Sequence, residues 1–316
     1  MSRNCLYCYN ALPENTEGDF HEQCSLDFFG TLQQPDFSYS LAEMDELAKS
    51  VIERSIAVPG VQPKLSLTLV NSALTEGHNA RLTIVGALGG NYIFKPPSAV
   101  FQEMPQNEHL TMRMAEAFGM KTAKSSLIRL KSGELSYITK RFDRTDLGEK
   151  IHMIDMFQIL EAFDKYKSSM EKVGKAVGEY SSRAVFDKLY YFELGVFSFL
   201  TGNNDMHLKN FSLLLDRGKW VLSPAYDLLN VAIVNPEDKE ELALTLEGKK
   251  KKLRLENFQS LGAKIDLNEK QIMSVFKRFE KLKPTAFKWI ENSFLSEEFK
   301  AKYTELMSKR YQLLYR

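Results

Sequence analysis

The most informative segment of the sequence is residues 202–230, GNNDMHLKNFSLLLDRGKWVLSPAYDLLN. It contains Asp205, then Asn210, and near its end Asp227. Two apolar runs, 211–215 and 220–222, flank the polar turn Asp-Arg-Gly. Apolar runs on both sides of a glycine-containing turn predict two strands joined by a tight turn. We therefore expect a hairpin with an acid and an amide before it and a second acid after it.

This order of residue types is typical of the catalytic and metal-binding segment of a protein kinase. Phosphoryl transfer depends mainly on positioning and on charge neutralisation. Asp205 is suited to accept the proton of a substrate hydroxyl, and oxygen atoms of Asn210 and Asp227 are suited to hold Mg²⁺, a hard ion. Lys209 lies beside them and is placed to screen charge on the transferred group. The alternative is a polar hairpin whose Asn and Asp residues only form turns.

Composition limits the class of protein. The chain has 316 residues, of which 44% are hydrophobic and 26% charged, so a packed core is expected. A formal net charge of +1 gives no electrostatic reason to expect nucleic acid or an anionic membrane as the main partner. No apolar run approaches the roughly 18 residues of a membrane span, and the N-terminus lacks an apolar signal segment. These features predict a cytoplasmic protein.

The cysteines form their own pattern at the N-terminus. All three lie in the first 24 residues, as Cys5-x2-Cys8 and His21-x2-Cys24. This Cys₃His spacing is typical of a zinc knuckle, and Zn²⁺ would hold a segment too short to build a core. We predict a structural zinc site. The alternative is free thiols on a flexible arm.

The region before the hairpin alternates between strands and helices. A linker is expected at 31–40, followed by a helix at 41–53 that Ser40 and Glu43 cap. Lys95 ends a strand and could grip phosphate, and Glu108 near the start of a helix could pair with it, as in kinases. An exposed Lys and a first-turn Glu favoured by the helix dipole are the alternatives. The other elements predicted here are strands 64–70, 80–85, 91–95, 126–130 and 135–141, and helix 105–119.

The second half is predicted to be mainly helical. A long apolar helix at 182–201 leads directly into the loop with Asp205 and should support it rigidly. The fold class is therefore α+β, with a mixed-sheet lobe and a helical lobe. Three segments are expected, at 1–40, 41–145 and 146–316. Further helices are predicted at 153–163, 169–178, 255–261, 268–282 and 297–314.

Six motifs in this order resemble the HipA family of bacterial toxin Ser/Thr kinases: VPGVQPKLS, YIFKPP, NEHLTMRMAEAFG, YITKRFDR, GNNDMHLKNFS and SPAYDLLN. The resemblance runs from about residue 50 to the C-terminus. It implies a two-lobed kinase-like fold, ATP with Mg²⁺, a DNA-binding antitoxin partner, and aminoacyl-tRNA synthetases as substrates whose phosphorylation stops translation.

The resemblance also implies roles for individual residues. It makes Asp205 the proton acceptor, Asn210 and Asp227 the Mg²⁺ ligands, and Lys95 the phosphate-binding lysine. The remaining nucleotide-contacting positions are a covering loop of Pro59, Gly60, Val61, Gln62, Pro63 and Lys64, a hinge of Lys140, Arg141 and Phe142, and the loop residues His207 and Lys209.

Two features depart from the long HipA proteins. Only about 50 residues precede the covering loop, which is similar to the short HipT toxins. In those toxins a separate small protein replaces the N-terminal subdomain, and the target is tryptophanyl-tRNA synthetase. Short toxins can carry an autophosphorylated Ser-Ile-Ser motif, which here reads Ser55-Ile56-Ala57. Ser55 remains a candidate, since a phosphate there would eject the loop. Otherwise it is an ordinary polar residue at a helix end.

Two other functions stay open. A small-molecule phosphotransferase of the same fold would place phosphate on a metabolite. A kinase-fold module without activity would only bind an antitoxin. The intact set of Lys95, Asp205, Asn210 and Asp227 argues against the second, because a decayed kinase usually loses one of them.

Overall fold

A computed structural model describes residues 3–44, 46, 64–70, 80–84, 90–98, 100–145 and 147–315. Ser55, Ala57 and the covering-loop positions Pro59 to Pro63 lie outside these described residues. The contacts divide the chain into two compact units. The first unit comprises Met1–His109 and Ala123–Gly148, and the second comprises Leu110–Thr122 and Glu149–Arg316.

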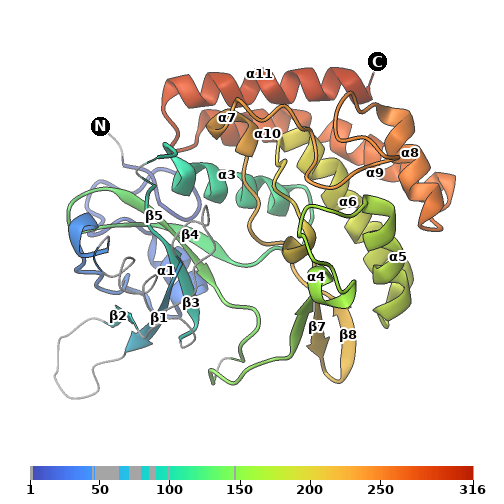
Figure 1. Cartoon of the computed structure of the whole chain (residues 1–316). Helices are drawn as coiled ribbons and strands as arrows, with labels where there is room; N and C mark the ends of the chain where they lie inside the picture. Colours follow the sequence, from blue (N-terminus) through green and yellow to red (C-terminus); the bar gives the residue numbers. More distant parts are fainter. Residues whose placement is uncertain are drawn as a thin grey trace. The chain divides into compact units, whose positions relative to one another are not determined.

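The first unit is built on an antiparallel sheet (Figure 1). Its strand order is β2-β1-β3-β5-β4, and every neighbouring pair is antiparallel. The central strand β3 pairs Phe94 with Ile138 and Lys95 with Tyr137. All five strands were predicted, with nearly the same bounds. These bounds are β1 Leu65–Val70, β2 Arg81–Ile84, β3 Tyr92–Lys95, β4 Ser125–Arg129 and β5 Leu135–Lys140.

The N-terminal segment packs on this sheet. Its helix α1 (Glu22–Phe29) ends at Gly30, whose φ of 82° fits the left-handed C-terminal cap that glycine favours. Phe28 and Phe29 are buried and approach the ring of Tyr92 on β3. The segment is thus part of the core of the first unit, which excludes the flexible-arm alternative.

Helix α3 (Met104–Ala117) follows the sheet's central strand in the chain, as predicted. Its first turns, through His109, belong to the first unit, and the rest belongs to the second unit. The start of the predicted helix after Ser40 is also present. The Ser40 amide donates to Glu43 Oε2 at 2.7 Å, as a capping box requires.

The second unit surrounds helix α6 (Ala184–Thr201). Every residue of α6 from Tyr191 to Thr201 is buried, and most of this run is apolar. A small antiparallel sheet lies in the same unit, in the order β6-β7-β8. Its strands are β6 Met153–Asp155, β7 Ser212–Asp216 and β8 Lys219–Leu222, and the last two confirm the predicted hairpin.

The remaining helices of the described second unit are α4 Met156–Ile159, α5 Met170–Tyr180, α7 Val231–Val234, α8 Leu255–Lys264, α9 Glu269–Lys281, α10 Lys283–Glu291 and α11 Glu297–Leu314. The predicted helix at 153–163 is confirmed only over Met156–Ile159 and is wrong at both ends. Met153 to Asp155 pair with β7 instead, and Asp155 caps the short α4 that follows. Helix α10 was not predicted; Pro284 lies in its first turn, where proline is favoured.

Among the described residues, none of the helices combines the length and the apolar character that crossing a bilayer needs.

Candidate active site

Lys95 and Glu108 form a buried ion pair in the first unit. Lys95 Nζ lies 2.7 Å from Glu108 Oε1, and the side chains are only 5% and 3% exposed. Burying two charges is costly, so such a pair persists only where its geometry is good. The predicted pairing is confirmed, and the alternatives of an exposed lysine and a dipole-favoured glutamate are wrong.

The sheet and the helix each fix one partner of this pair. Lys95 is the last residue of β3, and its ammonium lies 5.4 Å from the ring centre of Tyr137 on the neighbouring strand β5. Glu108 lies early in α3, which is a regular helix of 14 residues. Two rigid elements therefore hold the pair.

The loop after α6 carries two of the predicted site residues, Asp205 and Asn210. Helix α6 ends at Gly202, with φ of 72°, and a Cβ there would lie 2.7 Å from Asn230 Oδ1. Only glycine fits both the backbone angle and this close approach. Asn210 Nδ2 donates to the Asp205 carbonyl at 3.0 Å. The amide nitrogen is thereby used, and Oδ1 is the atom that could bind a cation.

Tyr166 orients the Asp205 carboxylate. Its hydroxyl donates to Asp205 Oδ1 at 2.7 Å, and the Asp205 side chain is otherwise half-buried. Burial, followed by this hydrogen bond, raises the pKa of Tyr166. A phenol that stays protonated is a steady donor to a carboxylate. Sequence reasoning missed Tyr166, because the phenol lies far from Asp205 in the chain and no motif links them.

His207 is a buried histidine in the same loop. Its ring lies 5.1 Å from the ring of Tyr166, edge to face, and its Nδ1 atom has no hydrogen-bond partner among the described residues. Burial lowers its pKa, although the charges of Asp205 and Asp227 act in the opposite direction. His207 is therefore a neutral group beside the carboxylates. Lys209 is exposed and places its ammonium 4.7 Å from the ring centre of Phe157.

Asp227 follows β8 in a loop that is tied to helix α6 and to the segment after α3. It adopts a left-handed backbone with φ of 59°, which Asp tolerates better than most residues. Two residues earlier, the Ala225 amide donates to the Tyr190 hydroxyl of α6 at 2.8 Å and to the Lys121 carbonyl at 2.8 Å. Tyr226 donates to the Lys209 carbonyl at 2.8 Å, which links this loop to the loop with Asp205.

The predicted hinge residues lie at the end of β5. The Lys140 amide donates to the Lys124 carbonyl, and the Arg141 amide donates to the Asn91 carbonyl, both at 2.8 Å. Arg141 also holds Asp143 through two hydrogen bonds, and Phe142 is half-buried. Lys64, directly before β1, is exposed.

The predicted zinc ligands come together. One ligand atom from each of Cys5, Cys8, His21 and Cys24 lies within 4.8 Å of every other, and these cysteines form no disulfide. A hydrogen bond from Cys8 lowers the pKa of Cys5 to about 4, and the same bond with burial raises the pKa of Cys8. A thiolate within a cluster of this composition is what a soft divalent ion binds.

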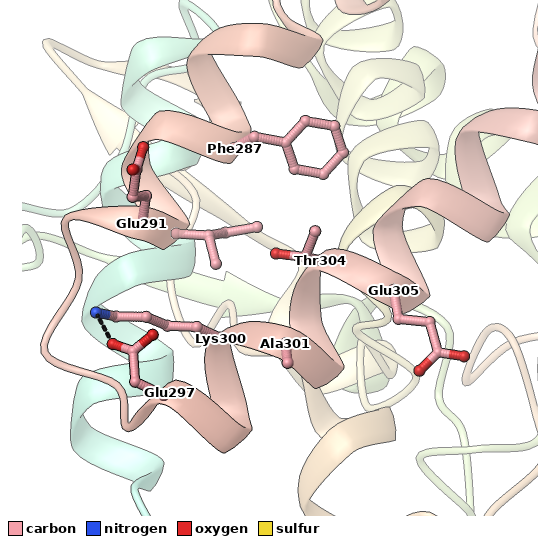
Figure 2. Close-up of a pocket in the computed structure, with 8 residues that line it drawn as sticks. Phe287, Glu291, Glu297, Lys300, Ala301, Thr304 and Glu305 are labelled. Carbon is pink, nitrogen blue, oxygen red and sulfur yellow. Dashed lines mark hydrogen bonds and ion pairs between the residues drawn. The ribbon is translucent and has the colours of Figure 1, made fainter.

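A groove of about 640 Å³ lies between α10 and α11 in the second unit (Figure 2). Its charged side chains include Glu291, Glu297 and Lys300, with the last two joined as an ion pair at 2.9 Å. None of the predicted site residues that the structure describes lines this groove, so it is separate from the groups described above.

The chain is similar in sequence to a family of kinase-related proteins. A family model described as a HipA-like C-terminal domain matches residues 56–286. A putative kinase, Y4dM, of Sinorhizobium fredii is 35% identical over 201 residues, which are 58% of this chain and 48% of that protein. The Ser/Thr-protein kinase toxin HipA of Shewanella oneidensis is 25% identical over 214 residues, covering 61% of this chain and 47% of the toxin.

Solved structures share the fold. The chain is similar to the Shewanella oneidensis HipA structure, determined with HipB and operator DNA, with a TM-score of 0.65 and 20% identity. That match covers 96% of this chain and 74% of the other. The Helicobacter pylori kinase CtkA gives a TM-score of 0.50 and 17% identity over 78% of this chain and 92% of the other. The chain spans about half the length of the curated relatives it matches.

Proposed function

Because the chain belongs to the HipA-like C-terminal domain family, we propose that it is an ATP-dependent Ser/Thr protein kinase. The observation that carries this proposal is the buried Lys95–Glu108 pair at 2.7 Å. A pair of buried charges adds little net stability, so a functional reason for it is favoured. In protein kinases a strand lysine and a helix glutamate form this pair, and the lysine binds ATP phosphates.

Lys95 would bind the phosphates of ATP while Glu108 holds its ammonium in place. A lysine held by a buried carboxylate loses less conformational freedom on binding a nucleotide than a mobile surface lysine would. The proposed reaction needs Lys95 and the acids of the second unit to act on one ATP molecule.

Asp205 would accept the proton of the substrate hydroxyl as its oxygen attacks the γ-phosphorus of ATP, whose bond to ADP breaks so that ADP leaves. The Tyr166 hydroxyl occupies Oδ1 of this carboxylate at 2.7 Å, so Oδ2 is the atom assigned to the substrate. His207, kept neutral by burial, adds no positive charge that would lower the basicity of Asp205.

Asn210 and Asp227 would hold Mg²⁺. Their donor atoms are an amide oxygen and a carboxylate, which are the ligands that a hard cation takes. The Asn210 amide fits this role because its nitrogen is tied to the Asp205 carbonyl. The ion would supply charge neutralisation on the phosphates when it is bound.

The biological role that we propose is that of a toxin in a toxin–antitoxin system. The solved HipA structure that shares the fold contains HipB and operator DNA. By analogy, the partners would be a DNA-binding antitoxin and a separate small antitoxin subunit. The substrate would be an aminoacyl-tRNA synthetase, with the tryptophanyl enzyme as the first candidate. Autophosphorylation at Ser55 would switch the kinase off, since a phosphate adds about two negative charges beside bound ATP.

The test is to incubate the protein with radiolabelled ATP, Mg²⁺ and purified synthetases. We expect label on one synthetase, and Asp205→Asn should reduce transfer by at least about 100-fold. Asp216→Asn, which changes an exposed acid at the end of β7, is the matched control and should keep full activity. Label on no synthetase, together with equal toxicity of Asp205→Asn and the parent protein in cells, would reject the proposal.

The same reaction separates the alternatives. Label recovered in a small metabolite would favour the small-molecule phosphotransferase. Antitoxin binding without any ATP turnover would favour the binding module. For autophosphorylation, mass spectrometry after incubation with ATP should find phosphate on Ser55, and Ser55→Ala should leave the kinase active for longer.

A further inference from the structure

The cluster of three cysteines and His21 has the dimensions of a tetrahedral metal site. His21 Nδ1 lies 3.5 Å from Cys8 Sγ and 3.8 Å from Cys24 Sγ. Ordinary zinc–sulfur and zinc–nitrogen bond lengths place a sulfur and a nitrogen about 3.6 Å apart around a tetrahedral ion. All four ligand atoms lie within 4.8 Å of one another. The side chains are therefore already gathered around one point.

The tautomer of His21 suits a metal ligand. Its Nε2 atom lies 3.1 Å from the Ala11 carbonyl, which can only accept a hydrogen bond. The Nε2 atom therefore carries the proton, and Nδ1 presents its lone pair to the sulfurs. A backbone carbonyl that holds the outer nitrogen is the usual second support of a zinc-bound histidine.

The backbone around the first two cysteines is a tight knuckle. The Tyr9 amide donates to the Cys5 carbonyl and the Cys5 amide to the Asn10 carbonyl, both at 2.9 Å. Tyr9 itself is left-handed, with φ of 66°. Such a conformation in a residue other than glycine costs free energy and needs local support. A metal bound by the adjacent cysteines would supply that support.

Tyr9 connects this knuckle to helix α3. Its hydroxyl lies 3.0 Å from His109 Nδ1, and their rings meet edge to face at 5.3 Å. The other nitrogen of His109 lies 3.2 Å from the Ser125 carbonyl, so that nitrogen donates and Nδ1 accepts from Tyr9. His109 is fully buried and directly follows Glu108 in the chain. The contact therefore fixes the turn of helix that carries Glu108.

We propose that Cys5, Cys8, His21 and Cys24 bind one zinc ion, and that the zinc knuckle positions Glu108 against Lys95 through Tyr9 and His109. Tyr9 is thus a positioning residue, and zinc stabilises the pair without contacting substrate. The role given to Glu108 rests on the proposed kinase function, whereas zinc binding does not.

Metal content tests the first half of the proposal. The full-length protein, purified without added metal, should contain about one zinc per chain by plasma mass spectrometry. Cys24→Ser and His21→Gln should each lower the content severalfold, because both remove a ligand. His152→Gln, which changes an exposed histidine, is the matched control and should keep the metal. Zinc content that is equal in all four proteins would overturn the proposal.

Hydrogen exchange tests the second half without relying on catalysis. In Tyr9→Phe the zinc content should stay at the parent value, while amides of the first turns of α3 exchange at least about tenfold faster. Tyr39→Phe removes a hydroxyl elsewhere in the first unit and should leave α3 unchanged. Unchanged exchange in Tyr9→Phe would refute the link between the knuckle and the helix.

Steady-state kinetics and metal content together distinguish a failure of this proposal from a failure of the kinase proposal. Tyr9→Phe should raise the KM for ATP more than it lowers kcat, because Glu108 would hold Lys95 less well. If the parent protein transfers no phosphate, the kinase proposal fails while the zinc and exchange results still decide this one. If the parent protein transfers phosphate but contains no zinc, the zinc proposal fails while the kinase proposal stands.

Discussion

Neutralising Glu108 should destabilise the first unit far more than neutralising an exposed glutamate. Glu108→Gln removes the carboxylate charge that pairs with the buried ammonium of Lys95. At 2.7 Å and an effective dielectric constant of about 20, the attraction that is lost is roughly 6 kcal/mol. The glutamine oxygen still accepts a hydrogen bond and recovers part of this loss. We therefore expect a loss of about 3–5 kcal/mol in the free energy of unfolding.

The matched control is the exposed pair of Lys302 and Glu298 on α11. Its side chains are 47% and 71% exposed, and its two atoms lie 2.5 Å apart, so the pairs differ mainly in burial. Glu298→Gln should cost less than about 0.5 kcal/mol, because solvent screens the charges. A double variant, Lys95→Met with Glu108→Leu, removes both buried charges and should cost less than Glu108→Gln alone.

The assay must report on the first unit. Trp220 and Trp289 are the two tryptophans of the chain, and both lie in the second unit, so tryptophan fluorescence would follow the wrong part. Hydrogen exchange of the β3 peptide across a urea series measures the opening free energy locally. A loss of less than about 1 kcal/mol in Glu108→Gln, or a double variant no more stable than the single one, would contradict this expectation.

Three further changes test other parts of the chain. Gly202→Ala should cost about 2 kcal/mol more than Gly218→Ala, because both glycines have positive φ but only the first has neighbours within 3 Å of the added Cβ. Tryptophan fluorescence in urea measures this difference, and equal losses would contradict it. Tyr166→Phe removes the hydrogen bond to Asp205, so we expect kcat to fall about tenfold with KM for ATP unchanged, measured in steady-state assays. Hydrogen bonds from Ser, Asn and Lys side chains of α8 lower the pKa of Glu247 to about 2, from 4.5. The carboxylate therefore stabilises the fold above pH 4.5, and this contribution is lost as the pH falls toward 2. As the pH falls over that range, the melting temperature should fall less in Glu247→Gln than in the control variant Glu256→Gln, which neutralises the first-turn glutamate of α8.

Local sequence determined the elements whose signals lie within a few residues. The hairpin β7–β8 follows from two apolar runs around Asp-Arg-Gly, and α11 begins and ends at the predicted residues Glu297 and Leu314. The Lys95–Glu108 pair was also predictable, since a strand lysine and a helix glutamate in this order form a known motif. The spacing of the cysteines and His21 likewise predicts the four candidate zinc ligands.

Which distant side chains meet depends on how the elements pack together. The bonds from Tyr166 to Asp205 and from Tyr9 to His109 join residues 39 and 100 positions apart. Met153 to Asp155 form a strand only because β7 offers its free edge. Secondary-structure propensity and hydrophobic periodicity act between residues that are close in sequence, whereas these contacts depend on how whole elements pack. The chain's own pattern therefore predicts the elements and the reactive side chains, and packing selects the partners that hold them in place.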